Sequence, residues 1–245
     1  MEMDENLRMA LDSVAKEGFR DVADYDYIGA RVSFRLHLRD QFYWSALQAL
    51  EKYLKAILLF NGVKVKDISH SLQKLYRRVL ERTGFEISLN ENQKQFLSII
   101  EKFGNNRYRT KESRIIGHEL FEFDQLVWMI RHYALSTNLI VDGVTKTEWY
   151  VNNLAPPDER ETPTINQLID GELEKILSHD ASNPHRQELV WCNRYYGWTE
   201  NATQIPEIVR SSSHIPVYER DWFKNKFVEY KKPLADALRD FVKYP

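Results

Sequence analysis

Residues 42–62, FYWSALQALEKYLKAILLFNG, carry the most regular helical pattern in this chain of 245 residues. Apolar side chains recur there every three or four residues, which places them on one face of a helix: Phe42, Ala46, Leu47, Leu50, Tyr53, Leu54, Ile57 and Leu58. Asn61 and Gly62 follow, and both residue types accept the left-handed backbone that ends a helix. Burying each large apolar side chain contributes roughly 1.5–3 kcal/mol, so this helix is predicted to lie in the core.

Four other segments of the first 145 residues show the same spacing, and they are residues 24–39, 69–84, 90–104 and 118–143. Asp24 and Asp26 suit an N-cap and a first turn of the first segment. Ser69 is the predicted cap of the second segment. Short connections between consecutive helices favour antiparallel neighbours, so the predicted fold is all-α, an up-and-down helical bundle.

The pattern changes after Gly143. Residues 153–164 hold three prolines among polar residues, which is typical of a linker or surface loop. Further helices are predicted at 163–178, 184–196 and 217–243, the last divided at Pro233. The aromatic side chains after residue 190 favour a small core or, alternatively, a stacking surface for bases. We therefore expect an N-terminal extension at 1–19, a bundle at 20–144 and a mostly helical accessory region at 145–245.

Composition excludes several classes of protein. The formal net charge is −2, so binding to nucleic acid would need a local basic patch. No run of about 18 apolar residues predicts a membrane helix, and the single cysteine, Cys192, fits a reducing cytoplasm. Its aromatic neighbours predict a buried thiol. A glycine-rich phosphate loop is missing, and His179 and His185 lack partner cysteines, so no cofactor and no metal site is predicted.

Three motifs in residues 24–142 follow one another in a characteristic order. The helix pattern A-x-x-x-x-E-K-x-x-K-A-x-x-x-x-x-G is matched by Ala46, Glu51, Lys52, Lys55, Ala56 and Gly62. Ser69-His70-Ser71-Leu72 comes next, similar to T-H-x-L, and Arg107-Tyr108 follows the fourth helix. Together they resemble the HEPN domain (higher eukaryotes and prokaryotes nucleotide-binding) over about half of the chain. The resemblance implies a bundle that contacts a nucleotide, RNA or a nucleotidyltransferase-type protein, and that pairs as a homodimer.

The polar row on the 42–62 helix has two interpretations. Glu51 and Lys55 form an i, i+4 pair of the favourable orientation, worth a few tenths of a kcal/mol on a solvated face. Alternatively, Gln48, Lys52 and Lys55 line a groove that receives a phosphate or a partner's acidic edge. His70 is similarly open, because an imidazole at a helix start can fix the turn through a backbone carbonyl or serve as a ligand or catalyst.

A basic strip covers residues 102–114, with five basic residues and one acidic residue. Asn106, Arg107, Tyr108 and Arg109 are the predicted phosphate and base contacts, together with Lys52 and Lys55. The alternative is a solvated loop.

Ribonucleases of the HEPN family use R-x(4–6)-H near the start of the last core helix, where arginine holds the scissile phosphate and histidine moves protons. Here Arg114 and His118 are separated by three residues, yet positions four apart share a helix face, so they are the candidate catalytic pair. Arg31 and His37 have the family spacing but lie in the first predicted helix. The first hypothesis is therefore a nucleotide- or RNA-binding module. A metal-independent ribonuclease of the toxin or defence type and a structural adaptor are the alternatives.

Overall fold

The structure is a computed structural model, and it describes residues 4–66, 68, 70–105, 119–136, 140–141, 144–145, 171–196 and 241. The N-terminal rod consists of α1 (Glu5–Ser13), the π-helical η1 (Val14–Arg20) and α2 (Asp21–Arg35). Then come α3 (Arg39–Phe60), α4 (Leu72–Thr83), α5 (Glu91–Gly104) and α6 (Glu119–Arg131). A hairpin of β1 (Ile140–Val141) and β2 (Val144–Thr145) precedes α8 (Glu172–Ser178) and α9 (Pro184–Val190).

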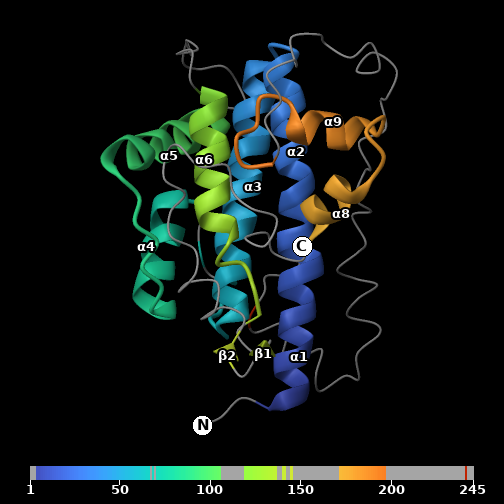
Figure 1. Ribbon diagram of the computed structural model, residues 1–245. Helices are drawn as coiled ribbons and strands as arrows, with labels where there is room; N and C mark the ends of the chain where they lie inside the picture. Colours follow the sequence, from blue (N-terminus) through green and yellow to red (C-terminus); the bar gives the residue numbers. More distant parts are fainter. Residues whose placement is uncertain are drawn as a thin grey trace.

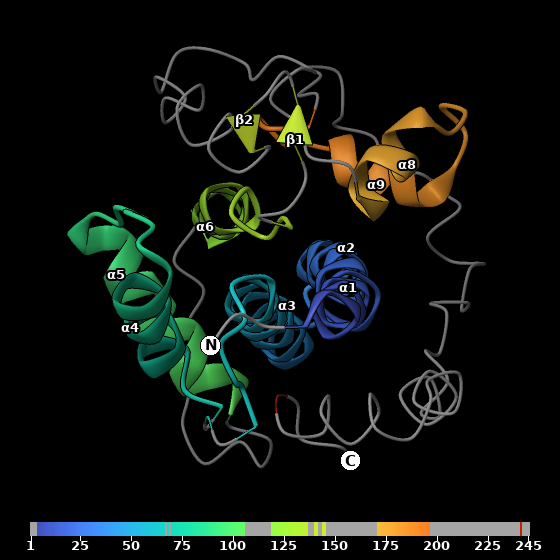
Figure 2. The same ribbon diagram turned by 90° about the horizontal axis from the view of Figure 1, so that it is seen from below.

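Helix α3 occupies the centre of the bundle, with α1 and α2 on one side, α4 and α5 on the other, and α6 beside it (Figures 1 and 2). From Phe42 to Phe60 every side chain is buried except Trp44, Gln48, Lys52 and Lys55, which are half-buried. The predicted core helix and the all-α fold class are therefore confirmed. The hairpin of β1 and β2, two residues a strand, is the one departure from helices and loops in the described part of the chain.

Several helix ends lie at the capping residues that the sequence predicts. Gly62 and Gly84 adopt φ values of 67° and 73°, the left-handed region that glycine enters without strain. Asn90 and Gln93 cap the N-terminal end of α5 with a reciprocal capping box. The cap predicted at Ser69 is wrong, because the Ser71 hydroxyl accepts the Lys74 N–H at the start of α4.

The first predicted helix differs most from the structure. Helical backbone runs from Glu5 to Arg35, and Leu11 and Val14 belong to the same core as α3. Asp24 and Asp26 are therefore not at a helix start, and the predicted N-cap is wrong. Both carboxylates instead pair with cations of other helices. The division of the chain at residues 19 and 144 stays a prediction.

The later segments agree in part. Helix α6 ends at Arg131, and the hairpin takes up part of the range where a helix was predicted to continue to 143. Helices α8 and α9 lie within the predicted ranges 163–178 and 184–196. Of the predicted helices at 217–243 only Phe241 is described, and its carbonyl accepts the N–H groups of Val65 and Lys66.

Buried ion pairs attach α8 to α2 and α6. The Arg131 guanidinium donates to both oxygens of Asp24 at 2.7 and 2.8 Å and to both oxygens of Glu174 at 2.7 Å. Tyr53 of α3 also donates to Asp24, at 2.6 Å. A Cβ at Gly171 would lie 2.6 Å from the Arg131 guanidinium, so glycine leaves room for this approach.

A second group of buried charges attaches α9. Arg31, which is fully buried, donates to Asp124 of α6 and to the carbonyls of Glu188 and Trp191. Burial by itself lowers the pKa of Arg31, but Asp124, Tyr27 and Glu188 together raise it above its ordinary value, so the guanidinium stays charged. Arg35 completes the group with a 2.6 Å ion pair to Glu188. Segment 171–196 therefore neutralises charges that the bundle buries.

Candidate functional site

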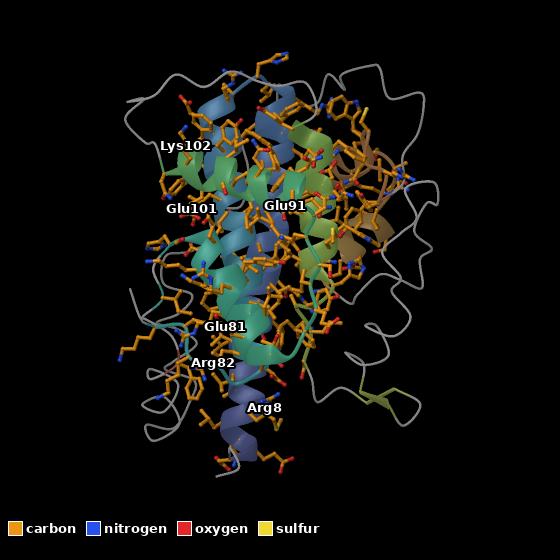
Figure 3. All side chains as sticks on the ribbon, turned by 90° about the vertical axis from the view of Figure 1, so that its left-hand side faces the viewer. Arg8, Glu81, Arg82, Glu91, Glu101 and Lys102 are labelled. Atoms are coloured by element: carbon orange, nitrogen blue, oxygen red, sulfur yellow. The ribbon has the colours of Figure 1, made fainter. Side chains whose placement is uncertain are left out.

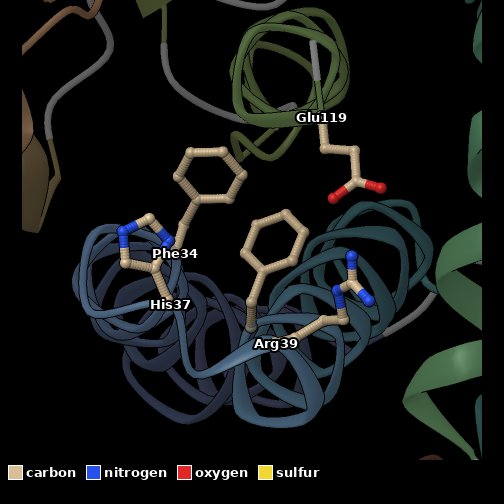
Figure 4. A pocket seen from close by; sticks show the side chains of 5 residues that line it. Phe34, His37, Arg39 and Glu119 are labelled. Atoms are coloured by element: carbon tan, nitrogen blue, oxygen red, sulfur yellow. The ribbon is translucent and has the colours of Figure 1, made fainter. Parts of the chain in front are cut away.

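A shallow pocket lies at the end of the bundle where α2 meets α3. It is lined by Phe34, His37, Arg39, Phe42 and Glu119 (Figure 4). His37 adopts φ 58° in the turn between the two helices and is exposed. In Figure 4 the Arg39 guanidinium points toward the Glu119 carboxylate at the start of α6. We call this region the bundle-end pocket.

Tyr43 connects the pocket to both ends of the 106–118 segment. Its hydroxyl donates to Glu119 Oε1 at 2.7 Å, and its ring lies 5.2 Å from the ring of Phe103. Burial and this hydrogen bond raise the pKa of Tyr43, so it remains a donor at neutral pH. Gly104 packs so closely that a Cβ there would lie 2.7 Å from the Tyr43 carbonyl and 2.6 Å from Leu47 Cβ. Tyr43 therefore contacts described residues that precede and follow residues 106–118 in the sequence.

Six predicted site residues lie between these two anchors and outside the described residues: Asn106, Arg107, Tyr108, Arg109, Arg114 and His118. Their assignments remain predictions. Their immediate neighbours in the described chain are Asn105, which follows the last residue of α5, and Glu119, the first residue of α6.

The other two predicted contacts are on the half-buried stripe of α3. Lys52 forms an ion pair with Asp26 of α2, and Lys55 pairs with Glu51 at 2.6 Å. At about 1.5 Å per helical residue, they lie roughly 14–18 Å along α3 from Tyr43. The expected Glu51–Lys55 pair is present, and Lys52 has a carboxylate partner from a neighbouring helix that sequence reasoning did not anticipate.

His70 is held by a side chain rather than by the turn. Its Nδ1 lies 2.9 and 3.1 Å from the two oxygens of Glu51, which is itself buried. The backbone-carbonyl contact considered for His70 is therefore replaced by a carboxylate from α3.

The Arg31–His37 pair, which matches the family spacing, is not a catalytic pair. Arg31 is fully buried among Asp124 and two carbonyls, whereas His37 is exposed. Sequence reasoning missed His37, Arg39 and Glu119 as pocket residues. The prediction extended the first helix to residue 39, although α2 stops at Arg35, residues 36–38 form a turn, and Arg39 begins α3. The polar residues between the two apolar patterns were the signal that could have predicted a turn there.

Three other predictions concern absence or burial. Cys192 is exposed, so the buried thiol predicted from its aromatic neighbours is wrong; it follows α9 with φ 49°. Within the described ranges, no group of three or more histidine, cysteine or acidic side chains is arranged to hold a metal ion. Across those same ranges, helices lack the combined length and apolar content needed to cross a membrane.

Comparison with known proteins adds one match. A family model described as "HEPN domain" matches residues 17–123. The matched range runs from η1 to the first turn of α6, so it includes Tyr43, the bundle-end pocket and the 106–118 segment. No curated protein and no solved structure matches the chain.

Proposed function

Residues 17–123 form a HEPN domain, and on this basis we propose that the chain binds the phosphate groups of a nucleotide or of RNA at the bundle-end pocket. The observation that carries the proposal is that Tyr43 contacts residues at both ends of the basic segment, Phe103 and Glu119. We propose that the cations of this segment act together with His37 and Arg39, which line the bundle-end pocket.

The charges suit such a ligand. Five basic residues and one acidic residue lie between positions 102 and 114, and Arg39 adds a cation at the pocket. Arginine and lysine contacts to phosphate supply sequence-independent affinity that falls as salt rises. Tyr108 is proposed to stack on a base, as aromatic side chains do with unpaired nucleotides. Single-stranded RNA or a free nucleotide is therefore favoured over a duplex.

Lys52 and Lys55 are proposed as contacts for a longer strand. Each is paired with a carboxylate, which offsets the charge that it could offer to a phosphate. We expect these lysines to contribute less affinity than Arg107 and Arg109.

The test is binding of labelled single-stranded RNA at several salt concentrations. Arg107→Ala with Arg109→Ala should weaken binding at least tenfold and make the slope of log K against log salt about 1.4 less steep, since each phosphate that is no longer neutralised accounts for about 0.7. The matched control removes two exposed arginines of α4, Arg77 and Arg82; Arg82 lies on the same face as Lys102 but well apart from it (Figure 3). If both double variants weaken RNA binding equally, the affinity comes from non-specific electrostatic attraction, and the proposed site is rejected.

A metal-independent ribonuclease is the second candidate, because the bundle-end pocket adjoins the start of α6. Glu119 lines that pocket and directly follows His118 in the chain. In this proposal Arg114 holds the scissile phosphate and His118 transfers protons at the 2′-hydroxyl or the leaving oxygen. Wild-type protein should cleave RNA in EDTA, and His118→Ala should not, whereas the exposed His179→Ala should behave as wild type. If the His118→Ala variant still cleaves RNA, the activity belongs to a contaminant or to another site.

A protein partner remains the third proposal. Membership of the HEPN family suggests a homodimer or a complex with a nucleotidyltransferase-type protein. Light scattering on the purified chain measures directly whether it forms a homodimer. If neither RNA nor nucleotide binds while a specific protein co-purifies, the structural adaptor replaces the binding module.

A further inference from the structure

The loop between α3 and α4 has a docking site that the chain fills with its own Phe241. The main-chain N–H groups of Val65 and Lys66 both donate to the Phe241 carbonyl, at 2.8 and 3.0 Å. Phe241 is 9% exposed, and the centre of its ring lies 5.4 Å from Lys64 Nζ. We call Lys64, Val65, Lys66 and the adjacent Arg78 of α4 the Phe241 docking site.

We propose that the Phe241 docking site binds an extended segment of another protein, one in which acidic residues flank an aromatic residue, and that Phe241 competes with this segment. The proposal goes beyond phosphate binding at the bundle-end pocket and does not depend on it. The pocket lies at the start of α3, and the docking site follows its end. Helix α3 has 22 residues, so about 33 Å separate its two ends.

The contacts of Phe241 favour a protein segment as the occupant. A pair of main-chain N–H groups binds a peptide carbonyl whatever the side chain is, and a pocket for one side chain then adds specificity. Val65 and Phe241 belong to the same hydrophobic core cluster. Because the site takes a peptide carbonyl and an apolar ring together, a protein segment fits it better than a nucleic acid does.

The charges around the site favour acidic residues beside the aromatic one. Lys64 and Lys66 are exposed on either side of buried Val65, and Arg78 Nη2 lies 3.4 Å from the Lys64 carbonyl. In the described part of the chain, no carboxylate forms an ion pair with these three cations. Complementary charge at the edge of an interface increases the association rate and the specificity of binding. A partner with acidic residues therefore gains contacts that Phe241 does not supply.

The attachment of Phe241 suits an occupant that exchanges. It consists of one carbonyl and one ring, whereas buried ion pairs of Arg131 with Glu174 and of Arg35 with Glu188 fix segment 171–196. Attachments without such pairs open locally while the rest of a protein stays folded. A tethered occupant has an effective concentration on the order of millimolar, so it sets the affinity that a free partner must exceed.

The experiment measures fluorescence anisotropy of a labelled peptide, residues 236–245, with the full chain. Phe241→Ala keeps the carbonyl but removes the ring, so this variant should bind the peptide roughly tenfold more tightly than the wild type does. A peptide carrying Arg239→Glu and Val242→Glu should bind the variant about threefold more tightly still. A peptide carrying Phe241→Ala should not bind.

A matched pair of lysine variants tests the position of the site. Added to Phe241→Ala, Lys64→Gln should weaken binding of the acidic peptide, whereas Lys94→Gln, which changes an exposed lysine of α5, should not. Equal peptide affinity of the wild type and Phe241→Ala overturns the proposal. So does an acidic peptide that binds no more tightly than the native one, or single-stranded RNA that binds the site in place of the peptide.

Hydrogen exchange of the wild-type chain keeps the test independent of how Phe241→Ala folds. The Val65 and Lys66 amides should exchange roughly tenfold or more faster than the Leu173 amide, which donates to the buried Asp24 at 3.2 Å. Saturating acidic peptide should slow the exchange of the two loop amides. If they exchange as slowly as Leu173 without peptide, Phe241 is a permanent part of the fold and the proposal is rejected.

Discussion

Replacing Arg131 by methionine should strongly destabilise the protein. The Arg131 guanidinium is buried, and it donates to both oxygens of Asp24 and both oxygens of Glu174 at 2.7–2.8 Å. Methionine fills much of the same volume but cannot donate, so Asp24 would be left as a charge with no exposed surface. Tyr53 and the Leu173 N–H still donate to it, at 2.6 and 3.2 Å.

The expected loss is about 3–5 kcal/mol, because removing one partner of a buried pair strands the other charge. For a chain of this length each kcal/mol lowers the melting temperature by about 2–4 °C, so the shift should be roughly 6–20 °C. Changing Asp24→Asn in the Arg131→Met background removes the stranded charge and should recover part of the loss. That recovery separates the electrostatic cause from a packing defect.

Urea unfolding followed by circular dichroism measures these free energies. Lys175→Met is the matched control, since Lys175 pairs with Glu172 at 2.5 Å on the surface of α8. Such exposed pairs contribute about 0–1 kcal/mol. A loss below 1 kcal/mol for Arg131→Met, or no recovery in the double variant, would show that segment 171–196 does not depend on this ion pair.

Two further variants test other parts of the fold. Gly104→Ala should cost about 1–3 kcal/mol in urea unfolding, because its Cβ would meet the Tyr43 carbonyl and Leu47; Gly29→Ala, which meets nothing within 4 Å, should cost nothing, and equal effects would contradict the close contact. Burial and His179 lower the pKa of His185 below 6.5, so its contribution to stability is present above pH 6.5 and is lost as the pH falls through the lowered value. His185→Gln should therefore reduce the drop in urea midpoint between pH 7 and pH 5; an unchanged drop would contradict the shift.

The helices that could be predicted are those with one apolar face and a chemical signal at each end. Helix α5 has its Asn90 cap and α4 its Gly84 terminator, and both lie close to their predicted ranges. The N-terminal rod could not be delimited, because Asp24 and Arg31 interrupt its apolar pattern. Those residues are buried only because Arg131 and Asp124, about 100 residues away, neutralise them. A pattern along one helix carries no information on such partners.

The candidate site was predictable to a similar degree. Motif order pointed to Lys55, Glu51 and His70, and the structure brings these three together. It did not point to Tyr43 as a shared anchor, because contacts with Phe103 and Glu119 depend on how α3, α5 and α6 pack. Spacing alone also matched Arg31 to the catalytic motif of the family, but Arg31 is fully buried and cannot contact a ligand at the surface.

The buried arginines of α2 also set the order of events during synthesis. Arg35 leaves the ribosome 153 residues before Glu188, its partner. At about 5–20 residues per second that interval is roughly 8–30 s. During this interval α2 carries an arginine that is buried in the folded protein but does not yet have its carboxylate partner. The nascent chain therefore cannot complete its core when residue 123 appears, and a chaperone that shields α2 would be most useful until α9 has been made.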